Sequence, residues 1–575
     1  SCSLTFGPLS RTGSGTVNFA GEGLGASGRS RIFIAGQPDG IIGTWATVNG
    51  SAPAAYSSTL GVYAGSEVSI AARGPSVIPD EASTVARITS DGTSGPITLA
   101  GDPVSHIGVL LQETGTAAEV ATAGKTLMAG SAGIAEGQAS LSLGVAPGDG
   151  TVMTLGAGSP LTFNNDSASA LTVNAAIADN GGPSALAKNG TGDVVIAGAT
   201  AYTGPTAISA GKLIFAGHTS TQTLNGAVSG AGSLAKSGTN TLHLLGANTY
   251  TGPTLINAGL VRVNLNTALG SSAAGTEIAA GATLDLGCTP DVGGTRDVSA
   301  LNMQAELITV QGAGLFGQGA IINSSTGVQI NALGKVALSG DATFSGISRW
   351  DIRDGTLAMN DRTLTKAGPS TFSLSQVAVT PGPSGTAAFD VQNGALRLQR
   401  TPDLGGSASN TVHIRPGMTI DFYDLSVAPA WTLLLDNGSS YNIDNSSAGS
   451  QNYWAGPVVL SGTNLLTSDG TFYGGFSGLV SGDGSLVKTN AHGFTVSGTN
   501  NTYAGPTRIA NGSLYVARLS NLGQPSSIGQ PATAENGAIR IGSGNLDGRL
   551  YYTGEGDTTD RAIDLAGTSG AAYLS

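Results

Sequence analysis

Charged and aromatic side chains are scarce in this chain of 575 residues. Charged residues make up 11% of it and aromatic residues 5%, and the formal net charge is −12 at pH 7. A negative chain lacks the basic footprint of a nucleic-acid-binding protein, and an anionic membrane surface would repel it. The composition therefore predicts no nucleic-acid partner and no attachment to acidic lipids.

Long apolar runs are also missing. No stretch reaches the ~18 consecutive apolar residues of a membrane helix, so we expect no membrane insertion by this section. The N-terminus lacks the basic and apolar segments of a signal peptide. The chain starts at Ser1 rather than at Met. This start predicts a processed product or one section of a longer protein.

Cysteine is limited to Cys2 and Cys288. A bridge between positions so far apart would require the N-terminus to fold back, so the favoured prediction is two unpaired thiols. An intermolecular disulfide through Cys2, near the chain end, is the alternative.

Glycine, by contrast, is abundant, with 89 residues, about twice the usual share. No G-X-Y period is present, which excludes collagen. Disorder usually needs low hydrophobicity together with high net charge, whereas 40% of this chain is hydrophobic. The composition favours β-structure built from small residues.

One stretch occurs three times, at 184–215, 232–263 and 484–516. Lys188 and Lys236 lie 48 residues apart, and so do Tyr202 and Tyr250. A fixed period of that length is typical of a repeat architecture.

Each copy contains short apolar alternations that Gly, Asn or Pro interrupts. They are too short for helices and rich in Leu, Val, Ile and Thr, which predicts strand, turn, strand, turn. In the middle copy the expected strands are 242–244, 254–256 and 260–263. We expect Gly246, Gly252 and Gly259 to supply positive φ at the turns.

The apolar faces of these short strands are too narrow for one copy of the repeat to bury alone, but copies that stack on one another bury them. The sequence therefore predicts an all-β, elongated, parallel β-solenoid. With coils of roughly 20 to 25 residues, the period would correspond to about two coils. A propeller is the main competitor, but more than 200 residues separate the second and third copies, whereas a ring would have evenly spaced blades.

The shared string L-x-K-x-G-x-x-x-L-x-L-x-G-x-N-x-Y-T-G-x-T-x-I-x-x-G-x-L-x-V resembles the autotransporter-associated β-strand repeat, also called the passenger-associated transport repeat. The resemblance implies a right-handed parallel β-helix exported to the bacterial surface. Pro after T-Y-T-G departs mildly from the common repeat. The motif positions, to which we assign a structural role, are Lys188, Tyr202, Gly204, Pro205, Lys236, Tyr250, Gly252, Pro253, Lys488, Tyr503, Gly505 and Pro506. We expect the three tyrosines to be packing or turn anchors rather than a ligand platform.

The pattern divides the chain into four sections. Residues 1–159 form an irregular N-terminal β-solenoid section, and residues 160–290 contain two clear repeats. Residues 291–480 are a divergent β-helix section. Residues 481–575 return to the repeat, and we expect this section to continue or to stack at its end.

No catalytic or metal site is predicted. The histidines lack metal-ligand spacing, and no nucleotide-binding loop or nucleophile elbow is recognisable, so no cofactor is expected. The histidines are His106, His218, His243, His413 and His492, and the charged clusters are Asp351 with Arg353 and Asp354, Asp421 with Asp424, and Asp557 with Asp560 and Arg561. In a regular strand Asp421 and Asp424 would point to opposite faces, so we expect these clusters to be solvated turn charges rather than the paired carboxylates of a glycosidase.

Two functions remain. The favoured one is a non-enzymatic, extracellular structural or adhesive solenoid, passenger-like and located at the bacterial cell surface. Its open backbone edges would pair with a longer copy of the same chain or with another copy, head to tail, as a filament. The alternative is a carbohydrate-binding or polysaccharide-degrading β-helix with a surface glycan as partner. Its groove would be lined by Trp454, Tyr453, Asp421 and Asp424, or by Tyr423 and Trp431. A third interpretation, compatible with the favoured one, is a segment whose repeats mainly guide export and folding outside the cell.

Overall fold

The computed structural model describes residues 3–11, 15–26, 30–287, 301–400, 402–405, 407–425, 428–444, 452–469 and 474–575. In these ranges the chain is nearly all β-strand, and its helices are the 3₁₀ turn η1 (Leu315–Gly317) and α1 (Ala534–Gly537). The all-β prediction is confirmed. Both cysteines lie outside the described residues. The chain forms two compact units, Ser1–Thr276 and Glu277–Ser575.

The first unit begins with strands that do not form coils. β6 (Ala52–Ser57) pairs antiparallel with β4 (Gly40–Ile41), β5 (Ala46–Val48) and β7 (Gly61–Ala64). Ile34, Val48, Tyr56 and Val62 form a small separate core here. Parallel pairs occur here as well, between β1 (Ser3–Phe6) and β3 (Arg31–Ile34) and between β2 (Val17–Phe19) and β5. The other early strands are β8 (Ser66–Ala71), β9 (Val77–Ile78), β10 (Glu81–Ser90) and β11 (Thr98–Leu99).

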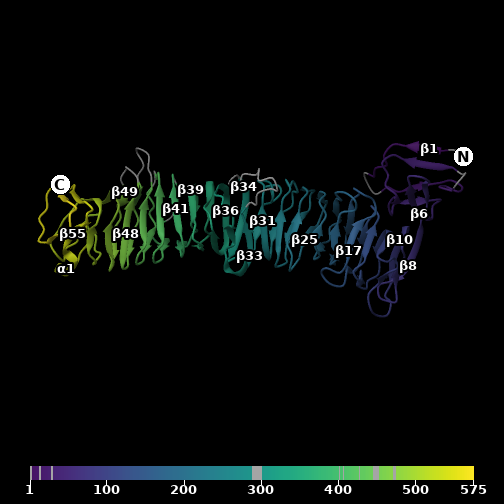
Figure 1. The fold of residues 1–575 in the computed structure, drawn as a ribbon, viewed down its shortest axis with the longest axis horizontal. Coiled ribbons are helices and arrows are strands. Elements are labelled where there is room, and N and C mark those ends of the chain that lie inside the picture. The colour runs from purple at the N-terminus through teal and green to yellow at the C-terminus, as the bar shows by residue number, and fades with distance from the viewer. Residues whose placement is uncertain are drawn as a thin grey trace. The chain divides into compact units, whose positions relative to one another are not determined.

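The rest of the first unit is a parallel β-solenoid. Each strand pairs in parallel with the strand one coil further on, so three columns of strands run along the stack (Figure 1, blue to teal). The first column holds β12 (Val104–Gln112), β15 (Ile134–Glu136), β18 (Leu161–Asn165), β21 (Leu186–Asn189), β24 (Thr206–Ile208) and β27 (Val228–Ser229). The second holds β13 (Ala118–Val120), β16 (Leu141–Leu143), β19 (Leu171–Val173), β22 (Val194–Ile196), β25 (Lys212–Phe215), β28 (Ser233–Lys236) and β30 (Thr254–Ile256). The third is built from β14 (Thr126–Ala129), β17 (Thr151–Thr154), β20 (Ala176–Ala178), β23 (Thr200–Ala201), β26 (Gln222–Leu224), β29 (Thr241–Leu244) and β31 (Gly259–Val263).

The parallel solenoid was predicted correctly, and β29, β30 and β31 match the strands expected in the middle repeat. The relation between repeat and coil differs from the prediction. Leu186 pairs with Thr206, and Thr206 pairs with Val228, so two coils take 228 − 186 = 42 residues rather than 48. The second repeat, which starts in β28, therefore begins on a different face from the first, which starts in β21.

Local alternation explains why these segments form strands. Along β22 and β29 every second residue is buried, because successive side chains of a strand point to opposite faces. Leu, Val, Ile and Phe fill the interior, and each coil covers the apolar surface of the coil below it. Parallel pairing of adjacent coils satisfies the backbone groups.

The second unit is also a parallel solenoid with three columns (Figure 1, teal through green to yellow). It starts with β33 (Ala282–Asp285) and β34 (Met303–Gly312). One column contains β35 (Ile321–Asn323), β36 (Gln329–Gly346), β38 (Thr363–Lys366), β40 (Ala388–Val391), β42 (Thr411–Ile414), β44 (Thr432–Leu435), β47 (Val458–Leu460) and β50 (Val480–Gly482). The next contains β37 (Trp350–Ala358), β39 (Thr371–Thr380), β41 (Ala395–Gln399), β43 (Thr419–Tyr423), β45 (Ser440–Ile443), β48 (Thr463–Ser468), β51 (Ser485–Lys488), β53 (Thr507–Ile509), β55 (Ile539–Gly544) and β57 (Ile563–Gly567). The last contains β46 (Asn452–Trp454), β49 (Gly474–Phe476), β52 (Gly493–Val496), β54 (Gly512–Val516), β56 (Gly548–Tyr552) and β58 (Ala572–Leu574).

Aromatic rings gather in the interior of this second unit. Trp350 lies 4.8 Å from Phe372 between ring centroids, and Phe422 stacks on Tyr441 at 4.4 Å. These rings belong to consecutive coils and are fully buried. Aromatic rings from successive coils therefore fill part of this core.

Candidate functional site

The repeat motif builds the same hydrogen-bonded turn in all three copies. The Tyr202 hydroxyl lies 2.9 Å from Thr206 Oγ1, and the equivalent distance from Tyr503 to Thr507 is 2.6 Å. Tyr250 and Thr254 form the third such pair, at 2.5 Å. Burial raises the pKa of Tyr202 and of Tyr503 above the usual value. The three rings lie in the interior, where no extended ligand can reach their faces.

The glycine and proline of the motif contact the preceding coil. Gly252 and Gly246 do not have positive φ, in contrast to the prediction, whereas Gly259 does, at 72°. A Cβ on Gly252 would lie 2.5 Å from the Gly232 carbonyl oxygen of the coil below, so close backbone approach selects glycine there. The Pro253 carbonyl accepts a hydrogen bond from the Leu234 amide. Gly204 and Gly505 approach the preceding coil in the same way, and the Pro205 and Pro506 carbonyls accept equivalent bonds.

The repeat lysines point inward and clip coil corners together. Lys188 Nζ donates to the Gly190 carbonyl at 2.6 Å and to the Ala210 carbonyl, one coil further on, at 2.9 Å. Lys488 Nζ donates to the carbonyls of Thr489 and Asn490. Lys236 Nζ donates to the Gly238 carbonyl. Each ammonium thus satisfies carbonyl oxygens that the corner leaves without a strand partner.

A fourth lysine of this kind is Lys366, which the sequence analysis missed. Its Nζ donates to the carbonyls of Ala367, Gly368 and Asn393 at 2.7, 2.8 and 2.9 Å. The signal was the short string L-x-K-x-G at 364–368, which matches 186–190. The rest of the repeat is absent around it, so the full motif did not reveal it.

These ammonium groups lie in a poorly solvated environment. Burial lowers the pKa of Lys236, Lys366 and Lys488 to about 8. Burial also lowers the pKa of Lys188, although Asp193 and Asp166 oppose the shift. The bonded partners of these ammonium groups are backbone carbonyl oxygens, so these contacts hold the corners in place.

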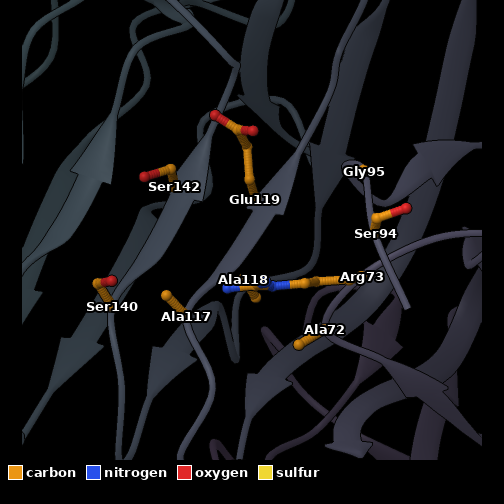
Figure 2. A pocket seen from close by; sticks show the side chains of 9 residues that line it. All are labelled: Ala72, Arg73, Ser94, Gly95, Ala117, Ala118, Glu119, Ser140 and Ser142. Atoms are coloured by element: carbon orange, nitrogen blue, oxygen red, sulfur yellow. The ribbon is translucent and has the colours of Figure 1, made fainter. Parts of the chain in front are cut away.

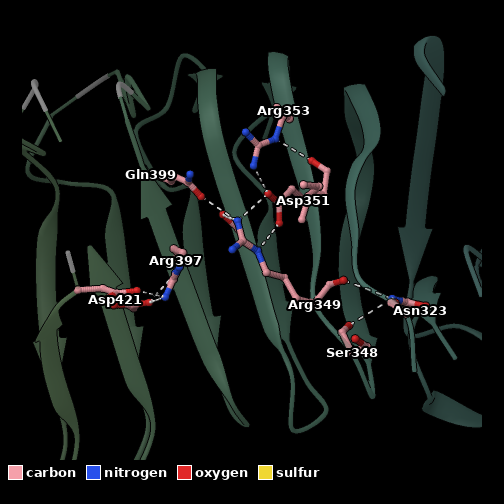
Figure 3. Close-up of polar contacts among 12 residues, drawn as sticks. Asn323, Ser348, Arg349, Asp351, Arg353, Arg397, Gln399 and Asp421 are labelled. Atoms are coloured by element: carbon pink, nitrogen blue, oxygen red, sulfur yellow. Dashed lines mark hydrogen bonds and ion pairs between the residues drawn. The ribbon is translucent and has the colours of Figure 1, made fainter. Parts of the chain in front are cut away.

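A column of polar side chains runs from coil to coil in the second unit, and Figure 3 shows its members Asp351, Arg397 and Asp421. Its members pair in register on six successive coils: Asp351, Ser373, Arg397, Asp421, Asn442 and Thr467. Arg397 donates to Asp421 at 2.5 Å and to Asp444 at 2.6 Å. Asn442 donates to the other Asp421 oxygen at 2.9 Å. The column is a ladder of hydrogen bonds and ion pairs between coils.

Asp351 ends this column in a clamp of two arginines (Figure 3). It is fully buried, and it accepts bonds from Arg349 at 2.8 Å and from Arg353 at 2.7 Å. Arg349 also donates to Gln399 Oε1 at 2.7 Å. Both oxygens of this carboxylate are therefore engaged by guanidinium groups, in charge-assisted hydrogen bonds.

These contacts correct two predictions. Asp351 and Asp421 are buried ion-pair partners rather than solvated turn charges. Burial raises the pKa of Asp421, and Arg397 opposes this shift. β43 ends at Tyr423, and Asp424 directly after it has a φ of 60°. Asp424 therefore lies at a corner and not in the strand.

The predicted carbohydrate groove is wrong in its main elements. Trp431 and Trp454 are fully buried, and their indole N–H groups donate to the carbonyls of Gly405 and Trp431. Tyr423 and Tyr453 are only partly buried, but their tryptophan partners are not available to a sugar. The structure therefore gives no aromatic platform at these residues.

The other candidate residues serve local contacts. Asp557 and Asp560 accept bonds from the amides of Leu519 and Leu522, and Arg561 donates to the Ile528 carbonyl. His106 bonds to Asp80 at 2.7 Å, and His413 to Asp436 at 2.9 Å. Within the described residues, no group of three or more His, Cys, Asp or Glu side chains could hold a metal ion.

A polar pocket of about 400 Å³ lies in the first unit (Figure 2). Arg73 and Glu119 line it, together with the hydroxyl groups of Ser94, Ser140 and Ser142. Its floor is formed by alanine side chains, and it has no aromatic wall. The charged groups among its lining residues are Arg73 and Glu119.

The same three segments match a known protein family. The passenger-associated-transport-repeat family matches residues 186–215, 234–263 and 486–516. This chain carries three passenger-associated transport repeats. The matched segments contain all the repeat lysines, tyrosines and Gly-Pro pairs described above except Lys366. The resemblance drawn from the sequence is confirmed.

The chain is also similar to the protein named Adhesin BmaC autotransporter of Brucella suis biovar 1 (strain 1330). The two are 29% identical over 418 residues, which is 70% of this chain. The chain spans only 12% of the length of that relative. No solved structure matches the chain significantly. No helix in the described ranges has the length and apolar character needed to cross a bilayer.

Proposed function

We propose that this chain is a non-enzymatic section of the surface-exposed passenger of an autotransporter-type adhesin. The observation that carries the proposal is the set of three passenger-associated transport repeats within a parallel β-solenoid. Similarity over 70% of the chain to a protein named as an autotransporter adhesin supports it. The section acts as a stiff scaffold on which adhesive surface is carried.

The internal contacts support a scaffold. The polar side chains of the repeat turns, the lysine corners and the ladder at Arg397 and Asp421 bond to one another or to the backbone. Such contacts hold coils together without leaving a reactive group poised for a substrate. The proposed role therefore depends on folding and surface exposure rather than on chemistry.

The test compares bacteria that produce the intact protein with bacteria from which the section encoding residues 1–575 is deleted. Antibody labelling and protease treatment of intact cells report surface exposure, and adherence to host cells reports function. We expect the section to be labelled on intact cells and the deletion to lower adherence. Unchanged adherence by a deletion protein that is still displayed would overturn the adhesive role.

A deletion of one coil is the matched control. Leu213 pairs with Leu234 one coil later, so removing residues 213–233 lets Leu234 occupy the place of Leu213 in register. A scaffold built of repeated coils should keep its export and adherence after this change. Loss of adherence in a displayed one-coil deletion would point to a specific site on the removed coil instead.

We further propose that sections of this kind associate end to end, because the terminal rungs of a β-solenoid leave backbone groups unpaired. Sedimentation and negative-stain microscopy of the purified chain over a concentration series test this. Longer particles at higher concentration are expected. Particles of one length at every concentration would contradict end-to-end association.

A further inference from the structure

Glu136 is a buried carboxylate whose two oxygen atoms have no hydrogen-bond partner in the described part of the chain. It is the last residue of β15, and its side chain points to the same inward side as that of Ile134, so that only 2% of the residue is exposed. A buried charge without a partner is costly. An unsatisfied buried group in a native fold therefore indicates a partner that the chain itself does not supply.

The strands on either side of Glu136 carry amide side chains at the same position. Glu136 pairs in register with Gln112 of the preceding coil and with Asn165 of the following coil. Gln112 Nε2 donates to the carbonyls of Thr114 and Thr116, at 2.7 and 2.8 Å. Asn165 Nδ2 likewise donates to two backbone carbonyls, each at 2.8 Å. In both neighbouring coils this position therefore supplies a donor to carbonyl oxygens at the corner that follows the strand.

Corners of this solenoid also bind a positive charge. Lys188, in β21 of the same column, donates from its ammonium group to the carbonyls of Gly190 and Ala210 at 2.6 and 2.9 Å. The Lys366 ammonium is held by three backbone carbonyls at 2.7, 2.8 and 2.9 Å. Backbone carbonyls also bind hard metal cations. A corner of this kind can therefore hold a metal ion through the same oxygen atoms that hold an ammonium group.

Glu136 brings oxygen atoms to a corner where its neighbours bring a donor. The carbonyls two and four residues further on, which Gln112 uses in its own coil, here belong to Gln138 and Ser140. An ionised carboxylate accepts hydrogen bonds and cannot donate to them. The Ser167 hydroxyl lies near the carboxylate but points to the Gln138 carbonyl, at 3.5 Å. Carboxylate and carbonyl oxygens are the ligands that Ca²⁺ takes in proteins.

The charge of the corner favours a divalent ion. Glu136, at −1, together with a divalent cation, at +2, gives the net charge of +1 that the Lys188 ammonium gives its own corner. Mg²⁺ is smaller than Ca²⁺ and gives up its water ligands reluctantly, so it usually keeps several of them. A buried corner bounded by backbone therefore favours Ca²⁺.

We propose that Glu136 binds one calcium ion at this corner, together with the carbonyl oxygens of Gln138 and Ser140. The Ser140 carbonyl already accepts a bond from the Ala118 amide at 2.9 Å, and its second lone pair remains for the ion. The site has one carboxylate and backbone oxygens, so it differs from a cluster of acidic or histidine side chains. The ion would hold the corner as the ammonium group of Lys188 does. This inference does not depend on the proposed role in adhesion.

A site with one carboxylate binds calcium weakly. Extracellular calcium-binding modules have dissociation constants of about 10⁻⁴–10⁻³ M, and the number of charged ligands tunes the affinity. We expect a value at the weak end of this range, about 1 mM. Calcium at about 10 mM would then shift the local equilibrium about tenfold toward the ordered corner. Without calcium the carboxylate has no partner, so Glu136→Gln should then be more stable than the wild type.

Hydrogen exchange of the full chain, with and without calcium chloride, tests the site locally. In the wild type, calcium at about 10 mM should slow exchange of the amides at 134–140 about tenfold. Glu136→Gln should show no such slowing, and Glu119→Gln, at a partly exposed residue of the same unit, should respond as the wild type does. Slowing that sodium chloride of equal ionic strength reproduces, or that Glu136→Gln retains, would overturn the proposal. Circular dichroism verifies that both variants are folded.

Equilibrium dialysis with radioactive calcium gives an independent measurement. Weak binding elsewhere on a chain of net charge −12 should be shared by all variants. The wild type and Glu119→Gln should therefore bind one calcium ion more per chain than Glu136→Gln. Equal binding by the three proteins would overturn the proposal. So would an infrared band of a protonated carboxyl group that is present at neutral pH with calcium and lost in Glu136→Gln, because a proton would then be the partner of this side chain.

Discussion

The hydroxyl of Tyr503 lies 2.6 Å from Thr507 Oγ1, and both side chains are buried beneath the Gly-Pro turn that separates them. Tyr202 and Thr206, and Tyr250 and Thr254, form the same hydrogen bond at the same separation of four residues. The threonine after Gly-Pro is therefore part of the repeat turn. Gly529 lies against the Tyr503 ring, where a Cβ would meet ring atoms at 2.9 Å, so the tyrosine also fixes the chain of a neighbouring segment.

Tyr503→Phe should lower the free energy of unfolding by about 1 kcal/mol, because it removes one buried hydrogen bond and leaves the Thr507 hydroxyl without this partner. Hydrogen exchange of the amides around 503–516 measures the local effect. Tyr573→Phe, at a side chain that is 40% exposed, is the control and should leave exchange unchanged. Equal protection in both variants would contradict the role assigned to the turn.

Stability should rise between about pH 8 and pH 10. The buried Lys236, Lys366 and Lys488 have pKa values near 8 in the folded chain, against 10.5 for the free side chain. In that window the unfolded state binds more protons than the folded state, so the free energy of unfolding increases with pH. Each lysine contributes on the order of 2 to 3 kcal/mol across the full range. Denaturant unfolding at pH 7, 8, 9 and 10 checks the sign.

Lys366→Met separates the two roles of a buried lysine. The variant should lose part of the rise in stability with pH, because one titrating group is gone. It should also be destabilised by about 1–3 kcal/mol above pH 9, because three carbonyl oxygens lose their donor. Lys212→Met, which removes a partly exposed lysine paired with Asp193, is the control. An unchanged pH profile in Lys366→Met would contradict the assignment.

Glu136→Gln should stabilise the first unit. Glu136 is buried in register between Gln112 and Asn165, whose amides donate to corner carbonyls. Burial raises the pKa of Glu136, and the nearby Ser167 hydroxyl offsets this only in part. The folded state therefore binds more protons than the unfolded state just above pH 4.5, and stability falls as pH rises there.

The glutamine variant can donate as its neighbours do, so we expect a gain of about 1 kcal/mol at pH 7 and a flatter stability profile between pH 4 and 7. Thermal unfolding over that pH range measures both. Glu119→Gln, at a partly exposed residue of the same unit, is the control. A loss of stability in Glu136→Gln would contradict the prediction, because it would show that the buried carboxylate stabilises the fold.

Arg397→Met should destabilise the second unit by about 3 kcal/mol, because Asp421 would remain buried without its charged partner. Arg397→Met combined with Asp421→Leu should recover much of this loss, because the unpaired charge is then removed. Arg400→Met, at an exposed arginine, is the control. Urea unfolding of the wild type, Arg397→Met, Asp421→Leu and the double variant gives the coupling energy, and additive effects of the two substitutions would contradict a direct pair.

The sequence predicted more of the fold than of the contacts within it. Alternation in 241–244 and 254–256 gave the strands, since the two-residue period of a strand is local. The roles of Trp454 and Asp421 could not be read in this way. The sequence shows that a residue is aromatic or acidic. Whether its side chain is buried depends on residues of neighbouring coils, which the sequence does not identify.

The amino-acid sequence by itself determined the parallel stack and its family of repeats, because the spacing of apolar residues, glycine and proline recurs with the motif. Only the tertiary structure decided that a repeat advances to the next face, so that Lys188 pairs with Ile208 in one column and Lys236 with Ile256 in another. The coil length sets this offset, and the length of each coil is fixed by how its corners pack. The same packing brings the corner carbonyls to Lys366, whose surroundings carry no recognisable repeat.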